Sequence, residues 1–293
     1  MTGILLVDKP EGITSAGVIR ALKSCFGGEK VGHLGTLDPF ASGLLPLCVG
    51  EATKVARYLL LEHKAYEGRI RLGSETDTLD GTGTTTGNAV VPAIGEVELE
   101  RVQAIFSGAQ RQTPPMYSAL KRDGVPLYKL ARQGLEVERA ARDVTIHSLD
   151  LRLAEPTAID FAVRCSKGTY VRVLAADIGR ALGTMAHLER LRRTVVGPFR
   201  VEDAWTPERL QAVGPQAWPV VAIVEALRGL PRLTIDERGL AGLRHGQQDS
   251  LRALVPGEPG EAALVLDGAG RVAAVIEMGL PATGWRLVRL LAE

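Results

Sequence analysis

Two segments of this chain alternate between apolar and polar side chains, and this alternation constrains the fold more than any other feature. In residues 66–72, Tyr66, Ile70 and Leu72 alternate with charged side chains, and residues 159–165 repeat the pattern with Ile159 and Phe161. A period of two residues is typical of a strand that buries one face. Residues 171–178 then carry apolar side chains at helical spacing. The chain is predicted to form an α+β fold.

The N-terminal part adds further elements to this fold. Residues 4–7 are apolar and predict a buried strand, and a helix is expected to start at Ser15. A second strand is expected at residues 44–49 and a second helix at residues 52–61. The polar connection from Gly32 to Gly43 is bracketed by glycines and lies between the first helix and the second strand.

The length of 293 residues favours two units, because most domains contain about 50–250 residues. Beyond residue 229 the pattern changes to short apolar runs that are separated by glycine and proline turns. We therefore predict a larger domain at residues 1–228 and a small β-rich domain at residues 229–293.

Charge gives no global reason to expect a nucleic-acid partner, since the net charge is +1 and the pI is about 7.8. Residues 113–142, however, are locally basic. The positive side chains that we select there are Lys121, Arg122, Lys129 and Arg132. Such a run is either a solvated face or a contact to phosphates.

The cysteines and histidines suggest no metal site. Cys25, Cys48 and Cys165 form no closely spaced pair and are interpreted as reduced core residues. The histidines lack ligand spacing as well. The N-terminal apolar run is too short for a signal peptide or a membrane span. We expect a cytoplasmic protein with no metal and no membrane association.

Asp38 lies in the connection from Gly32 to Gly43, which reads GHLGTLDPFASG. An aspartate before proline is usually a turn former or a helix cap, and that interpretation stands for Asp38 in isolation. The connection resembles the motif around the catalytic aspartate of the TruB-type tRNA pseudouridine synthases. Four further stretches resemble motifs of this family in the same order: VDKP at residues 7–10, KAY at 64–66, PPMYSA at 114–119 and SKGTYVR at 166–172.

The resemblance implies a pseudouridine synthase domain with a mixed, largely antiparallel sheet flanked by helices, followed by a PUA-like RNA-binding domain. It implies isomerisation of uridine 55 in the T-loop of tRNA, with the target uridine flipped out of the stack. Every atom of the nucleotide is retained, so no cofactor is required. The expected partner is the T-arm of tRNA, and the protein is expected to be a monomer without an obligate protein partner.

Three catalytic residues follow from the resemblance. Asp38 is the catalytic carboxylate, and Arg172 keeps it charged in a dry site. Tyr66 stacks on the uracil and is a candidate for proton transfer. The alternative interpretations are a surface arginine on a helix for Arg172 and an ordinary core tyrosine for Tyr66, which is compatible with a place at the pocket.

The resemblance also implies substrate contacts outside the chemistry. His33 fills the space in the RNA base stack that the flipped nucleotide leaves. The alternative is an ordinary loop histidine that is exposed to solvent. Tyr170 and Leu191 wall the pocket, and Lys9 supports the active-site loop or contacts RNA. The insertion at residues 113–142 clamps the RNA through its four selected basic residues, and Arg190, Arg192 and Arg193 form a second basic patch.

Three other interpretations remain open at this point. The chain could be a non-catalytic RNA-binding or folding protein, although the intact Asp38, Tyr66 and Arg172 argue against that. It could be a guide-RNA-dependent synthase within a larger ribonucleoprotein. A hydrolase with an aspartate nucleophile is disfavoured, because no acidic cluster or histidine base accompanies Asp38. The atom that Asp38 attacks, C1′ or C6, is not determined by the sequence.

Overall fold

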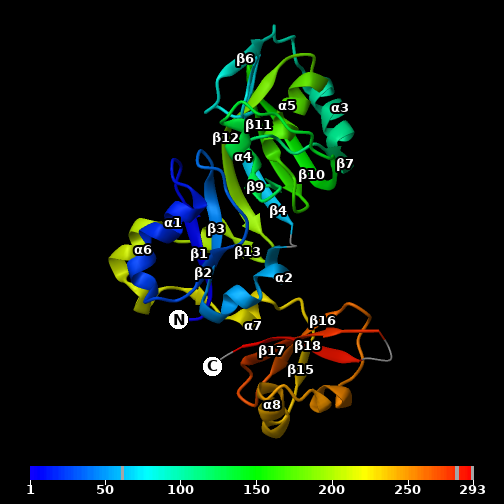
Figure 1. Ribbon diagram of the computed structural model, residues 1–293. Coiled ribbons are helices and arrows are strands. Elements are labelled where there is room, and N and C mark those ends of the chain that lie inside the picture. Colours follow the sequence, from blue (N-terminus) through cyan, green and yellow to red (C-terminus); the bar gives the residue numbers. More distant parts are fainter. Residues whose placement is uncertain (61–62, 281–283, 292–293) are drawn as a thin grey trace.

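The computed structural model describes residues 1–60, 63–280 and 284–291, and one large sheet dominates it (Figure 1). Its strands are β1 (Gly3–Lys9), β2 (Val31–His33), β3 (Ser42–Val49), β4 (Lys64–Leu72), β7 (Gly108–Gln112), β10 (Arg142–Glu155), β11 (Ala158–Cys165), β12 (Ala186–Val196), β13 (Phe199–Arg200) and β14 (Val220–Val221). The order is β14-β1-β3-β12-β4-β11-β10-β7, with β2 beside β3 and β13 beside β12. All pairs are antiparallel except β3 with β12. The expected mixed, largely antiparallel sheet is confirmed.

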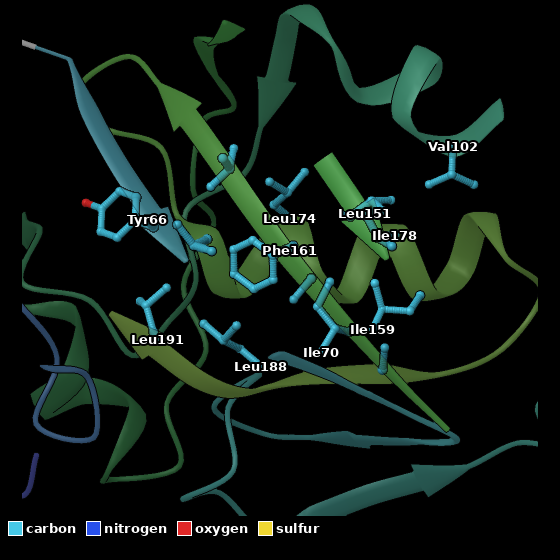
Figure 2. Close-up of a cluster of buried hydrophobic side chains, with 14 of the residues drawn as sticks. Tyr66, Ile70, Val102, Leu151, Ile159, Phe161, Leu174, Ile178, Leu188 and Leu191 are labelled. Carbon is cyan, nitrogen blue, oxygen red and sulfur yellow. The ribbon is translucent and has the colours of Figure 1, made fainter. Parts of the chain in front are cut away.

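The half of the sheet that contains β4, β10, β11 and β12 is covered by two helices, α3 (Glu96–Phe106) and α5 (Val171–Ala181). Figure 2 shows Leu174 and Ile178 of α5 facing Phe161 of β11 across this core. The predicted alternation is confirmed, because Ile70 and Ile159 are buried on the inner face. Each such side chain contributes roughly 1.5–3 kcal/mol through its removal from water.

The other half of the sheet contains β1, β2, β3 and β14. The helices beside it are α1 (Ser15–Ala21), α2 (Ala56–Leu60), α6 (Pro207–Val213) and α7 (Ile223–Ala226). Helix α1 begins at Ser15 as predicted, because the hydroxyl of Thr14 accepts a hydrogen bond from the backbone of Gly17 at 2.9 Å. The helix expected at residues 52–61 is partly wrong. A 3₁₀ turn (Gly50–Lys54) precedes α2, the backbone of Val55 is not helical, and residue 61 lies outside the described residues.

The connection from Gly32 to Gly43 is also shorter than expected. The short strand β2 includes its first two residues, Gly32 and His33, and pairs with β3, so the remaining connection does not follow a helix directly. Gly43 is the second residue of β3 and has φ at 102°, and any side chain there would collide with the backbone of Arg193 in β12. The glycine therefore allows β3 and β12 to approach one another.

Two small hairpins and one short helix extend from the large sheet. They are β5 (Ser74–Thr76) with β6 (Thr85–Asn88), β8 (Lys121–Arg122) with β9 (Val125–Pro126), and α4 (Leu127–Ala131). The pair β8–β9 and α4 belong to the basic segment at residues 113–142. This segment thus has its own local structure between β7 and β10.

A separate four-stranded sheet forms the C-terminal part of the molecule (Figure 1). Its strands are β15 (Arg232–Thr234), β16 (Ala262–Leu266), β17 (Val272–Met278) and β18 (Trp285–Leu290). Helix α8 (Glu237–Arg244) follows β15 and precedes β16 along the chain. Leu264 and Val275 pack in one apolar cluster with Ile4 and Leu6 of β1. The C-terminal sheet is therefore packed against the large sheet through apolar side chains.

Candidate active site

Asp38 lies in a loop whose backbone is held at the two residues that flank it, Leu37 and Pro39. The Ser15 hydroxyl accepts a hydrogen bond from the Leu37 amide at 2.9 Å and donates to the Leu37 carbonyl at 3.1 Å. The Lys9 ammonium donates to the Pro39 carbonyl at 3.2 Å. Each residue adjacent to Asp38 is thus fixed by a buried side chain. The carboxylate is presented by a rigid backbone, as a catalytic group requires.

Arg172 is the second residue of α5 and is almost fully buried. Its Nε lies 3.0 Å from Oδ2 of Asp38, and the side chains of Arg172 and Asp38 are 5% and 35% exposed. Its other two nitrogens donate to the carbonyls of Thr78, at 2.8 Å, and Tyr117, at 2.7 Å. The guanidinium is therefore fixed by three separate segments of the chain, and it pairs with Asp38 as the resemblance implied.

A second carboxylate, which the sequence did not indicate, lies beside this arginine. Asp80 is 5% exposed at its side chain, and its Oδ2 lies 3.4 Å from Nη1 of Arg172. Its other oxygen accepts hydrogen bonds from the Thr78 hydroxyl, at 2.9 Å, and from the backbone amide of Thr82, at 3.0 Å. The only local signal is a short turn rich in threonine, aspartate and glycine. Nothing in that turn identifies an arginine 92 positions away as its partner.

The protonation of Asp38 reflects opposing influences. Burial raises the pKa of Asp38 above its ordinary value, the nearby Arg172 lowers it, and the like charge of Asp80 raises it again. The net direction is upward. Arg172 thus favours the charged form, but it only partly offsets the cost of removing the carboxylate from water.

A cavity of about 320 Å³ opens beside Asp38. Tyr66, Tyr170, Arg172 and Leu191 line it, together with residues 118–120 from the basic insertion. The structure therefore brings the three candidate catalytic residues and both candidate wall residues into one cavity. Its size falls in the range of pockets that hold small ligands.

Tyr66 joins the apolar core to this cavity. Its ring belongs to the same cluster as Phe161 and Leu191, whereas its hydroxyl points away from that cluster (Figure 2). Burial raises the pKa of Tyr66, so its neutral phenol is favoured. Both interpretations of Tyr66 apply, since it is a core residue and a wall of the pocket at once.

The basic residues of the insertion lie on its outer surface. Lys121, Arg122, Lys129 and Arg132 are all exposed. Arg122 donates to the Glu138 carbonyl at 3.0 Å. These side chains present positive charge to solvent from an element that also forms one wall of the cavity.

His33 lies on β2 and is only half-buried, and it is not among the residues that line the cavity. Among the described residues, its Nδ1 is one of the few buried polar atoms without a hydrogen-bond partner. Burial lowers the pKa of His33, and the nearby charge of Arg193 adds to this effect. The neutral imidazole is therefore favoured.

Lys9 and Arg193 are both buried, which fits the expected support of the loop by Lys9 but neither an RNA contact by Lys9 nor a surface place for Arg193. Lys9 is fully buried and donates to the carbonyls of Pro10, Ile13 and Pro39, so it supports the loop and does not present charge to RNA. Arg193 is 1% exposed and cannot belong to a surface basic patch. Arg192 remains near the surface, where both of its terminal nitrogens donate to the carboxylate of Asp8.

In the part of the chain that the structure describes, no group of three or more histidine, cysteine, aspartate or glutamate side chains could hold a metal ion. No helix within residues 1–60, 63–280 and 284–291 is long and apolar enough to cross a membrane.

Comparison with known proteins identifies the family. A model of the TruB family pseudouridylate synthase N-terminal domain matches residues 23–171, and a model of the tRNA pseudouridylate synthase B C-terminal domain matches residues 172–217. The tRNA pseudouridine synthase B of Aromatoleum aromaticum is 50% identical over 236 residues, which are 80% of this chain and 76% of the relative. That of Syntrophotalea carbinolica is 43% identical over 278 residues, 93% and 91% of the two chains. The chain belongs to the TruB family of tRNA pseudouridine synthases.

The structural comparison agrees with this TruB assignment at the level of the fold. The chain superposes on a crystal structure of a Cbf5-Nop10-Gar1 complex with a TM-score of 0.74 and 24% identity, covering 99% of this chain and 84% of the other. The expected fold and the expected isomerase class of this TruB protein are both confirmed. Its C-terminal sheet lies beyond residue 217, where the matched TruB models end.

Proposed function

We propose that this pseudouridine synthase isomerises uridine 55 in the T-loop of tRNA, with Asp38 as its catalytic carboxylate. The observation that carries the proposal is the pairing of Asp38 with the buried Arg172 at one cavity, walled by Tyr66 and Leu191. The reaction breaks the bond from N1 to C1′, turns the uracil and forms a bond from C5 to C1′. The C5 proton is released, N1 takes up a proton in its place so that the product is an isomer, and no cofactor takes part.

Each wall of the cavity matches one requirement of this reaction. A detached uracil needs a flat apolar surface, which Tyr66 and Leu191 supply. A charged carboxylate needs a fixed counter-ion in a dry site, which Arg172 supplies. The target base has to leave the RNA stack before it reaches this cavity, and His33 is proposed to fill the space that it leaves. Tyr170, at the start of α5, closes another side of the pocket.

The exposed basic insertion is proposed to clamp the T-arm. Lys121, Arg122, Lys129 and Arg132 supply the local positive charge that phosphate contacts need and that the nearly neutral chain lacks overall. Residues 229–293 are proposed as a PUA-like RNA-binding domain that follows a catalytic domain at residues 1–228. We propose that the protein acts in the cytoplasm as a monomer, without a guide RNA or an obligate protein partner.

Asp38→Asn tests the catalytic proposal. The variant is expected to lose tritium release from tRNA that is labelled at uridine C5, while the Kd for that tRNA stays within about threefold. The matched control is Asp150→Asn, an exposed aspartate on β10 that pairs only with the exposed Arg152 among the described residues. Full activity of Asp38→Asn would contradict the assignment, whereas equal loss in both variants would point to damage of the fold.

The position of the target uridine is tested separately. Carbodiimide mapping of tRNA from cells without this gene is expected to show the loss of one pseudouridine in the T-loop. Activity of the purified protein on a bare T-stem-loop would distinguish a stand-alone enzyme from a guide-dependent one. Modification at another position, with the T-loop unchanged, would overturn the assignment of uridine 55.

A further inference from the structure

The active site spans a boundary within the large sheet. Strands β3 and β12 pair in parallel at two positions only, Arg192 with Ser42 and Arg193 with Gly43, and we call this pairing the seam. The half of the sheet before the seam carries the Asp38 loop, between β2 and β3. The half beyond it carries β4 with Tyr66, β12 with Leu191 and α5 with Arg172. The distance of Asp38 from its partners therefore depends on how the halves are joined.

The side chain of Arg193 crosses this seam. It starts on β12, where its backbone pairs with Tyr66 of β4. Its Nε donates to the Leu44 carbonyl at 2.8 Å, and its terminal nitrogens donate to the carbonyls of Gly35, at 3.1 Å, and Thr36, at 3.4 Å. Gly35 and Thr36 open the segment that leads to Asp38. One side chain from the second half thus holds both strand β3 and the loop that carries Asp38 in the other half.

A charged side chain at this buried position costs free energy, because its charge is removed from water. Arg193 is 1% exposed. Two more buried cations lie nearby: Lys64 lines the same cavity, and Lys9 binds the loop that carries Asp38. Its charge also lowers the pKa of Lys9 and that of His33. An apolar side chain could fill the space without the cost of desolvating a charge. A planar guanidinium offers several donors in one rigid plane, so it holds the three carbonyls in fixed directions.

We propose that Arg193 is a positioning residue for the isomerisation, which sets the place of the Asp38 loop relative to Tyr66 and Arg172 by binding the carbonyls of Gly35 and Thr36 across the seam. The proposal rests on the catalytic role proposed for Asp38. Arg193 also lines the cavity, but in this scheme it acts through the loop that carries Asp38 and not on the reacting atoms. Its contribution is to the geometry of the reacting groups and not to the affinity for RNA.

The test compares Arg193→Met and Arg193→Lys in the full chain. The readouts are the single-turnover rate constant for tritium release from C5-labelled tRNA at saturating enzyme, and the Kd for the same tRNA. Arg193→Met is expected to lower the rate constant about 100-fold, the scale for a misplacement of about 1 Å, and to leave the Kd within about threefold. Arg193→Lys keeps the charge and one donor group, and its rate constant is expected to be at least about tenfold higher than that of Arg193→Met.

Two controls separate positioning from a loss of stability. Val102→Ala opens a cavity in the core beneath α3, away from the cavity beside Asp38, and is expected to lower the midpoint of urea unfolding without changing the rate constant. Asp38→Asn measures the proposed function itself. A rate constant within twofold of the wild type in Arg193→Met would overturn the proposal. So would an equal loss of rate and affinity, or a lysine variant as slow as the methionine variant, while full activity of Asp38→Asn would instead refute the proposed function.

Discussion

Arg172→Gln removes the positive charge beside Asp38 while it keeps a side chain that can still donate to the carbonyl of Thr78 or Tyr117. Two unit charges about 4 Å apart attract by about 4 kcal/mol at an effective dielectric constant of about 20. Asp38 keeps 35% exposure at its side chain, and solvent screening reduces this value to about 2 kcal/mol. That energy corresponds to roughly a 30-fold change in the protonation equilibrium of Asp38.

The sign of the effect follows from the form that is stabilised. Arg172 favours the carboxylate and lowers the pKa of Asp38 against the upward effect of burial. Its removal therefore raises that pKa, so the active carboxylate form is lost at a higher pH. The acid limb of the pH–rate profile is expected to move to higher pH in Arg172→Gln.

The assay is the single-turnover rate of tritium release from C5-labelled tRNA between pH 5 and pH 9. The matched control is Arg180→Gln on the same helix, where an exposed guanidinium binds Glu75 and Asp177 outside the cavity. Its pH profile is expected to follow the wild type. An acid limb that stays unchanged in Arg172→Gln, with normal thermal unfolding, would refute this account of how Asp38 is kept charged.

Two further predictions concern the support of the catalytic loop. Burial lowers the pKa of Lys9 from 10.5 to about 8, so between these values the unfolded chain binds a proton that the folded chain has lost. The wild type should therefore gain stability relative to Lys9→Met as pH rises from about 8 to about 10.5, and parallel urea-unfolding midpoints of the two proteins would contradict this. Gly43→Ala should cost roughly 3 kcal/mol or more, because its Cβ would meet the Arg193 backbone at a positive φ. Gly28→Ala shares the positive φ but has open space, so it should cost only about 1–2 kcal/mol by the same urea titration, and equal losses would show that the close approach is unimportant.

Local sequence determined those parts of the fold that depend on neighbouring residues. The alternation at Tyr66–Ile70 and at Ile159–Phe161 predicted two strands correctly, because side chains on a strand face opposite sides in turn. The helix expected at residues 52–61 was partly wrong, because apolar spacing does not show where Val55 leaves the helical conformation.

The residues of the site likewise divide into those that the sequence indicated and those that it did not. The motif around Asp38 and the stretch that ends at Arg172 indicated two groups that the structure brings within 3.0 Å of one another. Asp80 carries no such motif, and Arg193, which was expected on a surface patch, is buried. Both residues have ordinary local surroundings, and their roles depend on partners about 90 to 160 positions away.

The sequence by itself thus determined the strands at residues 4–7, 44–49, 66–72 and 159–165, the family and the loop that carries Asp38, because these depend on local periodicity and on contiguous motifs. Only the tertiary structure decided that Arg172 serves two carboxylates and that Arg193 holds the loop from across the seam. The physical reason is that a charged side chain is stabilised in a dry interior by the donors and acceptors that surround it. Those surroundings exist only once distant strands have paired, so Asp38 acquires its counter-ion and its fixed position together with the fold.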